Sequence, residues 1–254
     1  LGDRIIFNYG GGAAANAGRL LLQVELTTNK LSLVQGSDGQ TQDIVKSATT
    51  INTGTWYHVV AVSNGTTYEL YINGQKESLT VSSGSNSGDW FADTTASGTV
   101  NSFVGGKRFN GTTSGSWDGI IDDFRIYDRP LSLDEVGELY LLTSPTGTDT
   151  TLKGYWSFNG KDISGTTAYD RSGVGNNGTL TNGPTVTPGK VGQALSFNGS
   201  NQRVTISTPV TATPLTTTAW IKPSTLRSAV PVAILDTAST WNGLYIPLSS
   251  GNIT

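Results

Sequence analysis

Apolar and polar residues alternate along much of this chain with the two-residue period that a half-buried β-strand requires. The clearest stretch runs from Ile120 to Tyr127, where the apolar side chains are available to a core and the Asp and Arg side chains to solvent or a metal ion. Pro130 then interrupts strand pairing, because proline has no N–H to donate. Ser132 and Glu135 form a capping box, so the pattern predicts a central strand followed by a short helix at about residues 132–142.

Shorter apolar runs predict further strands, and turn residues separate them. Asn-Gly pairs, which favour tight β-hairpin turns, occur at residues 64–65 and 73–74 and recur in the second half of the chain. Asn29 suits a positive φ in the turn of another hairpin. Helix content is therefore expected to be very low, and the pattern is typical of an all-β protein. The predicted strands cover residues 5–7, 20–26, 31–33, 54–63, 67–72, 100–105, 154–158, 194–197, 203–207 and 217–221.

Several of these runs resemble sequence blocks of the laminin-G-like family of concanavalin A-like jellyroll domains. Residues 119–127 and 129–136 resemble the signature that closes such a domain, and residues 54–61 and 70–74 resemble two earlier blocks in the same order. The resemblance implies an all-β fold, a two-sheet antiparallel jellyroll sandwich with one short helix. Five later runs resemble the blocks that normally open a domain: residues 154–158, 170–173, 177–180, 191–199 and 219–223.

The order of the blocks departs from the family, because the closing blocks precede the opening ones. We therefore predict that residues 1–142 form the C-terminal part of a laminin-G-like jellyroll and residues 151–254 the N-terminal part, joined by a polar linker at residues 143–150. Neither part closes a sandwich alone, since its apolar faces and strand edges would meet water. The two parts are expected to complete one sandwich, either within one chain or between chains that exchange halves.

The two ends of the chain resemble each other. Apolar residues of the predicted hairpin at residues 20–33 recur 222 positions later, and those of the strand before it recur 228 positions later. This self-similarity predicts a tandem array with a repeat of roughly 220 to 230 residues. The alternative is a chance likeness between two amphipathic hairpins. The matched pairs include Ile6 with Ile234, Phe7 with Leu235, Asn8 with Asp236, Leu22 with Leu244, Val24 with Ile246 and Leu31 with Ile253.

Composition narrows the possible partners. Charged residues make up 14% of the chain and the net charge is −3, so no cluster of Lys and Arg is available to bind nucleic acid. Cys and Met are absent, which excludes disulfides, thiolate nucleophiles and thiolate metal sites. No apolar run approaches the length of about 18 residues that a membrane span needs, so membrane insertion is not expected. We expect an extracellular or cell-surface protein, of which this sequence is a fragment.

Calcium is the cation that the residue types favour, because the chain offers carboxylate, amide and carbonyl oxygens, no thiolate and one histidine. The resemblance implies a calcium near the Asp of the closing block and the Asn-Gly turn of the opening block. These positions are Asp122, Asp123, Asn198 and Asn201. The family often has Asp where this chain has Asn198, which removes one carboxylate. The alternative is that Asp122 and Asp123 only cap turns on a solvated strand face.

Aromatic side chains on exposed loops can stack on sugar rings. Trp90 and Phe91, in the polar loop at residues 82–99, and Trp241 are therefore the candidate ligand-binding residues. The alternative for Trp90 is that it folds back over an edge of the sandwich. Three further tryptophans lie in family blocks and are expected to fill the core: Trp56, Trp156 and Trp220.

The sequence offers no arrangement for catalysis. Glycoside hydrolysis, which concanavalin A-like folds also host, requires two carboxylates about 5 to 10 Å apart across a cleft. Asp134 and Glu138 fall on the predicted helix, and Asp122 and Asp123 would point to opposite faces of a regular strand. His58, the one histidine, has no nucleophile beside it and is expected to be structural.

The resemblance to laminin-G-like domains implies a non-catalytic module of a tandem-repeat surface protein that binds carbohydrate or glycoprotein in cell adhesion, with calcium helping to hold loops. The alternative is a structural spacer or building block of a surface filament, stalk or virion that has no glycan ligand. Self-association by exchange of jellyroll halves is also expected, whereas nucleic acid is not an expected partner.

Overall fold

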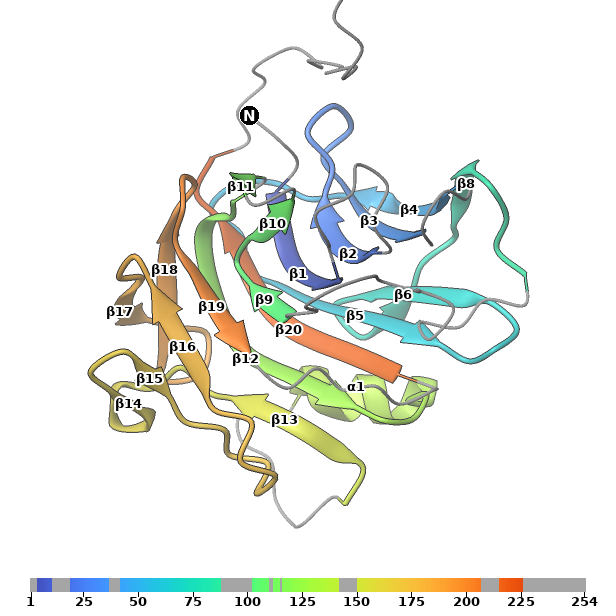
Figure 1. Ribbon diagram of the computed structural model, residues 1–254. Coiled ribbons are helices and arrows are strands. Elements are labelled where there is room, and N and C mark those ends of the chain that lie inside the picture. The colour runs from blue at the N-terminus through green and yellow to red at the C-terminus, as the bar shows by residue number, and fades with distance from the viewer. Residues whose placement is uncertain are drawn as a thin grey trace, which may run out of the picture.

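The computed structural model is a sandwich of two antiparallel β-sheets that enclose one apolar core (Figure 1). Among the described residues, one sheet has ten strands and the other eight, and a two-stranded ribbon pairs with neither. The all-β, two-sheet jellyroll that the sequence predicts is therefore confirmed. The structure describes residues 4–10, 19–36, 42–87, 102–109, 112–114, 116–141, 150–206 and 215–225.

The ten-stranded sheet combines strands from both ends of the described chain. In spatial order its strands are β14 (Ile163–Ser164), β15 (Thr167–Ala168), β16 (Gly178–Thr181), β19 (Arg203–Ile206), β9 (Ser102–Val104), β1 (Arg4–Gly10), β2 (Arg19–Val24), β3 (Lys30–Gly36), β4 (Asp43–Thr50) and β8 (Thr80–Ser83).

The eight-stranded sheet is centred on the long strand β12. In spatial order its strands are β17 (Thr185–Pro188), β18 (Gln193–Asn198), β12 (Asp118–Tyr127), β20 (Leu215–Pro223), β5 (Tyr57–Ser63), β6 (Tyr68–Ile72) and β7 (Gln75–Lys76), with β13 (Leu152–Trp156) also paired to β12. The remaining elements are the ribbon of β10 (Lys107–Phe109) and β11 (Thr112–Ser114), the helix α1 (Leu133–Leu141) and a 3₁₀ turn, η2 (Gly160–Asp162).

Strand β12 is the predicted central strand, and it pairs along both of its edges. One edge bonds first to β18 and then to β13, and the other edge bonds to β20. In the opposite sheet β9 pairs with β19. Each of these pairings joins a strand that precedes residue 142 to one that follows residue 149. Within this single chain, the two parts therefore share both sheets.

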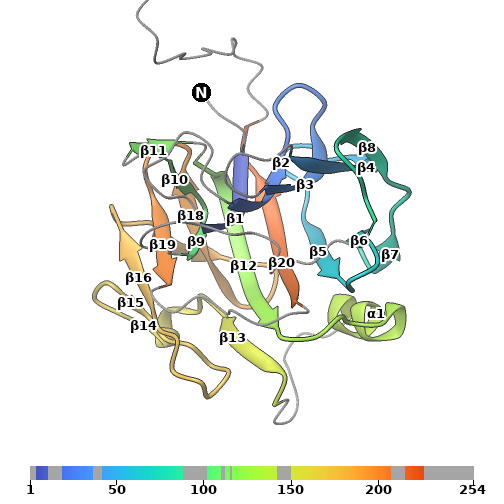
Figure 2. The same ribbon diagram turned by 45° about the vertical axis from the view of Figure 1, so that its right-hand side comes forward.

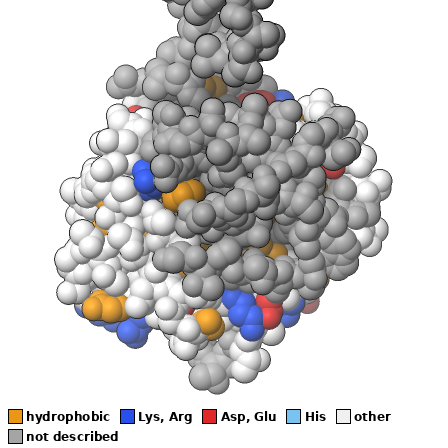
Figure 3. Space-filling view, viewed as in Figure 1, with side chains coloured by type: hydrophobic (Ala, Val, Ile, Leu, Met, Phe, Trp, Pro, Cys, Tyr) orange, Lys and Arg blue, Asp and Glu red, His pale blue; other side chains and the backbone are white. Residues whose placement is uncertain are grey.

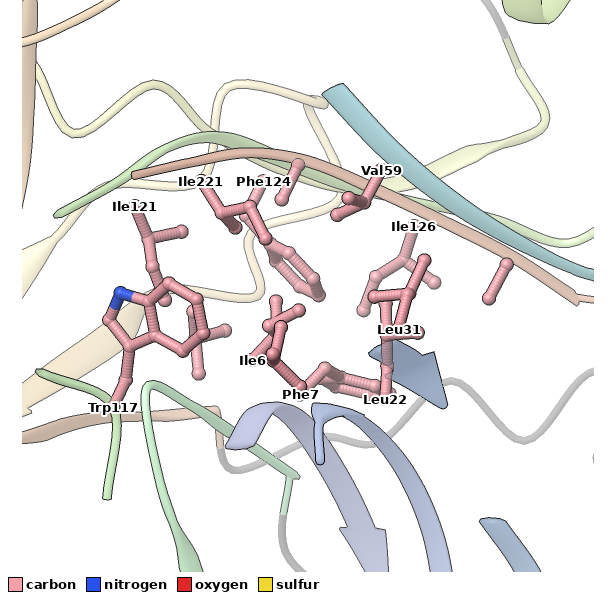
Figure 4. Packing of buried hydrophobic residues seen from close by; sticks show 14 of the residues in the cluster. Ile6, Phe7, Leu22, Leu31, Val59, Trp117, Ile121, Phe124, Ile126 and Ile221 are labelled. Carbon is pink, nitrogen blue, oxygen red and sulfur yellow. The ribbon is translucent and has the colours of Figure 1, made fainter. Parts of the chain in front are cut away.

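A stack of aromatic rings ties the two sheets together. Figure 4 shows Phe7 of β1 facing Phe124 of β12, and the centroids of the two rings are 5.3 Å apart. Phe124 also stacks on Trp156 of β13, with ring centroids 5.8 Å apart. Because Trp156 follows the segment 142–149, the stack joins residues from both parts of the chain.

The tryptophans divide between the core and the outside of the sandwich. Trp156 fills the core as expected, and so does Trp117, which no sequence block had indicated. Trp220 is buried on the outer face of the eight-stranded sheet, and Trp56 is only half-buried. The expectation for Trp56 and Trp220 was therefore wrong, because a family block fixes a strand but does not say which of its side chains face inward.

The helix α1 covers the outer face of the eight-stranded sheet near β5 and β6 (Figure 2). The predicted capping box is confirmed: the Ser132 N–H donates to Glu135 Oε2 at 2.8 Å, and the Glu135 N–H donates to Ser132 Oγ at 3.3 Å. Val136 is the buried residue of the helix and packs in a cluster with Val60 and Tyr127. The helix therefore makes a second, smaller apolar layer outside the main core.

Replacing Phe124 with Ala should lower the free energy of unfolding by about 3 to 5 kcal/mol, because the ring is fully buried between Phe7 and Trp156. Urea unfolding followed by tryptophan fluorescence measures the change. Thr80→Ala, at an exposed position on β8, is the control and should change stability by no more than about 0.5 kcal/mol. A loss of less than about 1 kcal/mol for Phe124→Ala would show that this ring does not couple the sheets.

Candidate functional site

Strand β12 carries a β-bulge at Asp122 and Asp123. Its register with β20 shifts between Asp122 and Arg125, and Asp123 has a positive φ of 50°. Ile121 and Phe124, on either side of the pair, both point into the inter-sheet core. The two carboxylates therefore lie together on the outer face of the eight-stranded sheet. The expectation that they point to opposite faces holds only for a regular strand and is wrong for this one.

The Asp122 carboxylate holds the turn between β17 and β18. Its Oδ2 atom accepts the backbone N–H groups of Lys190 and Val191, each at 2.8 Å, and Gly189 leaves no room for a Cβ beside that atom. The side chain is fully buried, and Asp122 Oδ1 has no hydrogen-bond partner among the described residues. Burial raises the pKa of Asp122 to about 7, with a further contribution from the neighbouring Asp123 charge, although the two N–H bonds oppose the rise.

Asp123 belongs to an adjoining set of buried polar contacts. Its Oδ1 atom accepts the Tyr155 hydroxyl at 2.9 Å, and its Oδ2 atom lies 3.6 Å from Arg125 Nη2. The Arg125 guanidinium lies over the Tyr155 ring, 4.6 Å from its centroid. Burial raises the pKa of Asp123, while Arg125 and Tyr155 act in the opposite direction. Asp122, Asp123 and Arg125 are all buried, so the idea that they face solvent is wrong.

Of the other two candidate metal ligands, Asn198 is the last residue of β18 and Asn201 lies on the turn that follows, and both are exposed. Asn198 lies opposite Asp118, four residues before Asp122 on β12, which is a distance of about 13 Å along a strand. Its Oδ1 atom accepts backbone N–H groups of its own turn. The structure therefore does not bring these asparagines together with Asp122 and Asp123, and the four residues do not fit a single calcium centre.

No group of three or more His, Asp or Glu side chains gathers within the ranges that the structure describes. Both carboxylates of the bulge already contact protein donors. Calcium binding consequently rests on the oxygen-rich composition of the turns and stays a prediction.

His58 lies on β5, on the same outer face as the bulge. Its Nε2 atom is 2.7 Å from the Thr218 hydroxyl, and its ring centroid is 5.3 Å from that of Trp220. Burial, with a smaller effect of the Arg125 charge, lowers the pKa of His58 to about 3, so the ring is neutral at pH 7. A buried, neutral and hydrogen-bonded imidazole agrees with the structural role expected for it.

A separate buried region lies on the outer face of the ten-stranded sheet. Because Leu22 and Leu33 point into the core, the residues next to them along β2 and β3 point outward. Ile5, Leu21 and Val34 form an apolar cluster there. We call the outward side chains of β1, β2, β3 and β9 the β1–β3 face. They include Ile5, Asn8, Leu21, Gln23, Ser32, Val34 and Phe103.

Gln23 and Ser32 lie opposite each other on this face, and both are buried. Gln23 Oε1 and Ser32 Oγ have no hydrogen-bond partner in the described part of the chain. A buried oxygen without a partner costs about 1 to 3 kcal/mol. Ser47, a buried serine of β4, differs: its Oγ accepts the Leu31 N–H at 3.0 Å and donates to the Thr49 carbonyl at 2.9 Å. The Gln23–Ser32 pair is thus an unsatisfied polar spot beside an apolar cluster.

The predicted ligand-binding residues Trp90, Phe91 and Trp241 lie outside the described residues. The described strands still show where the loop with Trp90 attaches: β8 is an edge of the ten-stranded sheet, and β9 lies beyond β4, β3, β2 and β1. Its attachment points therefore flank the β1–β3 face.

Sequence reasoning missed Gln23 and Ser32. Polar residues between apolar neighbours were the available signal, but alternation does not show that an outward residue is buried.

A comparison with known protein families tests the family resemblance of the sequence blocks. The sequence model described as the concanavalin A-like lectin/glucanases superfamily matches residues 2–137, which is more than half of the chain. The chain belongs to this superfamily. The matched region contains β12 with its bulge and the start of α1, so the affiliation inferred from the closing blocks is confirmed.

Among solved structures, this concanavalin A-like chain is similar to the crystal structure, at 2.1 Å resolution, of an S-layer domain-containing protein (residues 221–444) from Clostridium thermocellum ATCC 27405. The sequence identity is 26% and the TM-score is 0.28. The similarity covers 55% of this chain and 63% of the other, so it spans less than two thirds of that structure. A comparison with curated proteins gives no match.

The surface charge of this superfamily member does not point to a particular partner. On the side shown in Figure 3, the described Lys and Arg side chains form small, separate groups. Within the described ranges, no helix has both the length and the apolar character that crossing a membrane requires.

Asp122→Asn should remove a pH dependence of stability. Because the folded chain keeps the Asp122 proton up to about pH 7, whereas the unfolded chain loses it near pH 3.8, the unfolding free energy of the wild type should fall as the pH rises through this window. The fall should be on the order of a few kcal/mol. In the variant, the amide oxygen of the new side chain still accepts the Lys190 and Val191 N–H groups, so the stability of the variant should vary less.

Urea unfolding of both proteins from about pH 4 to about pH 8 measures the difference. Because the neighbouring Asp123 charge contributes to the raised pKa of Asp122, the difference between the two curves reports the loss of Asp122 together with its coupling to Asp123. Parallel curves would contradict the raised pKa of this carboxyl group.

Proposed function

We propose that this chain is a non-catalytic carbohydrate-binding module and that the β1–β3 face is its binding surface. The observation that carries the proposal is the pair of buried oxygens, Gln23 Oε1 and Ser32 Oγ, that have no partner within the described chain and adjoin the apolar Leu21 and Val34. A sugar presents hydroxyl groups and apolar C–H surface together, so it satisfies both kinds of protein group. Phe103 adds an aromatic ring on the β9 side.

Access to this face requires a rearrangement, because both oxygens are buried in the chain as it is described. The loop that joins β8 to β9 attaches on both sides of the face and contains Trp90 and Phe91. We propose that these two rings and Trp241 stack on the sugar while the polar atoms of the face bind its hydroxyl groups. Ligand entry should then be slower than diffusion alone would make it.

The positions of the carboxylates support binding without hydrolysis. Asp122 and Asp123 are buried and bonded within the other sheet, on its outer face. Glu135 is bonded to Arg129 at the start of α1. These acids therefore do not form a pair across an open cleft, which hydrolysis of a glycosidic bond requires. Adhesion at an extracellular or cell-surface location belongs to the same proposal and rests on the superfamily and the cysteine-free composition.

The second candidate is a structural spacer or building block of a surface assembly. The observation that favours it is the pairing of both parts of the chain within the two sheets, which also permits two chains to exchange halves. A spacer of this kind needs no glycan, so a glycan-binding experiment separates the two candidates.

Ser32→Ala should weaken glycan binding without a loss of stability. The substitution removes a hydroxyl that has no partner among the described residues, so the free energy of unfolding should stay the same or rise. The affinity for the sugar should fall about fivefold to tenfold, which corresponds to one hydrogen bond of roughly 1 to 1.4 kcal/mol. A glycan array identifies the sugar class, and calorimetry with that sugar measures the affinity.

Ser47→Ala is the matched control for that experiment. Its hydroxyl makes two hydrogen bonds, so its loss should lower the unfolding free energy by about 1 to 2 kcal/mol and leave the sugar affinity unchanged. Trp90→Ala should lower the affinity in protein that stays folded. A Ser32→Ala variant that binds as tightly as the wild type would show that the β1–β3 face is not the binding surface. Absence of binding by folded wild type would favour the spacer.

We also propose that calcium stabilises the exposed turns, including the one that contains Asn198 and Asn201. A bound ion stabilises the folded chain by an amount that grows with the logarithm of its concentration relative to Kd, about 2.7 kcal/mol at a hundredfold excess over Kd. The melting temperature should therefore rise when calcium replaces a chelator, and Asn198→Ala should reduce that rise. An unchanged melting temperature at millimolar calcium would contradict the proposal.

A further inference from the structure

Trp220 of β20 lies in the middle of a group of rings on the outer face of the eight-stranded sheet. His58 of β5 is opposite Trp220 in the ladder, and the two ring centroids are 5.3 Å apart. Tyr140 of α1 lies near both, with its ring centroid 5.5 Å from that of Trp220 and 6.1 Å from that of His58. The helix and the sheet therefore meet here through three rings.

Tyr140 has a fixed position although it is exposed. A Cβ on Gly74, in the turn between β6 and β7, would lie 3.3 Å from Tyr140 Cδ1, so the glycine leaves room for the ring. Tyr140 is 36% exposed, whereas Trp220 beneath it is 5% exposed. A ring that the fold already orients binds a ligand at a lower cost in entropy than a mobile one.

Two lysines border this group of rings. Lys190, in the turn between β17 and β18, is exposed, and its Nζ atom lies 4.8 Å from the centroid of the Trp220 ring. Its backbone N–H donates to Asp122 Oδ2, which anchors the turn. Lys222 follows Trp220 by two positions on β20, so its side chain leaves the sheet on the same face.

Neither lysine has a carboxylate partner among the described residues. Most of the described ion pairs occupy the other lysines and arginines of a chain whose net charge is −3. Lys190 and Lys222 therefore form a local positive spot beside Trp220. A negatively charged ligand complements such a spot.

His58 adds an unsatisfied polar atom to the same group. Its Nε2 atom contacts the Thr218 hydroxyl, but its Nδ1 atom is buried and has no hydrogen-bond partner within the described ranges. A hydroxyl group that enters beside Tyr140 can satisfy Nδ1 in either tautomer, because a hydroxyl both donates and accepts. The outer face thus combines positive charge, an oriented ring and a hydrogen-bonding atom.

We propose that Tyr140, Lys190, Lys222 and His58 form a second binding site, for an acidic sugar that carries a carboxylate on its pyranose ring. The apolar C–H side of the pyranose packs on the Tyr140 ring, and the two ammonium groups donate to the carboxylate. A sugar hydroxyl reaches His58 Nδ1. An acidic peptide supplies the carboxylate without a rigid ring that bears hydroxyl groups next to it. This site and the β1–β3 face lie on opposite outer faces of the sandwich, so the two are independent.

Calorimetry with oligogalacturonate and with its methyl ester tests the role of the carboxylate, because the ester keeps the pyranose rings and removes the charge. The wild type should bind the acid about tenfold more tightly than the ester, and its affinity should fall as salt is added. Lys190→Gln and Lys222→Gln should each lower the affinity about twofold to fivefold, and the double variant about tenfold. Tyr140→Ala should lower it about fivefold.

Matched controls are available elsewhere in the chain. Lys161→Gln removes the same charge from a lysine of η2 that also has no carboxylate partner in the described part of the chain, and Tyr169→Ala removes a tyrosine that is 44% exposed. Neither should change the affinity by more than about twofold. Ser32→Ala should leave it unchanged, so failure of this site and failure of the β1–β3 face give different results.

The lysine variants remove no described ion pair and should fold as the wild type does, which keeps the test valid even if Tyr140→Ala is unstable. Absence of binding by the folded wild type would overturn the proposal. So would equal affinity for the acid and the ester, or an equal loss in the Lys161→Gln control. Tighter binding of a polyglutamate peptide than of oligogalacturonate would overturn it in favour of an acidic peptide partner.

Discussion

The structure depends on the requirement that a buried strand has both edges paired. β12 lies between the core and the layer that includes α1 and Tyr155, so water does not satisfy its backbone groups. β18 and β13 bond to one edge and β20 to the other, and all three follow residue 149. The first part of the chain therefore supplies the centre of a sheet whose flanks come from the second part. This interlocking makes one core from the two parts of the chain.

The same strand brings charge into the interior. The bulge turns Asp122 and Asp123 to one face, and burial there raises both pKa values. The protein offsets part of this cost with two backbone N–H groups on Asp122 and with Arg125 and the Tyr155 hydroxyl around Asp123. The carboxylates thereby fasten the turn between β17 and β18 to the centre of the sheet. A structural role of this kind accounts for the acidic pair of the closing signature without invoking catalysis.

The β1–β3 face presents the opposite situation. On the far side of the sandwich, buried oxygens of Gln23 and Ser32 remain unsatisfied within the described chain, while nearby Ser47 makes both of its hydrogen bonds. Proteins rarely keep such atoms buried without a partner, because each one costs folding free energy. Ser47, with both hydrogen bonds made, belongs to a packed region of the ten-stranded sheet, whereas Ser32, without a partner among the described residues, marks a candidate binding surface.

The sequence by itself determined the period of the strands, the capped helix, several turns and the superfamily, because these depend on local spacing and on short blocks. It correctly placed β12, the capping box of Ser132 and Glu135, and the positive φ of Asn29. Only the tertiary structure decided which side chains are buried and together. A bulge of one residue put Asp122 and Asp123 on the same face, and it separated them from Asn198. Burial of Trp220 outside the core, and the unpartnered oxygens of Gln23 and Ser32 in the described chain, arise from contacts between strands far apart in sequence, which a local pattern does not encode.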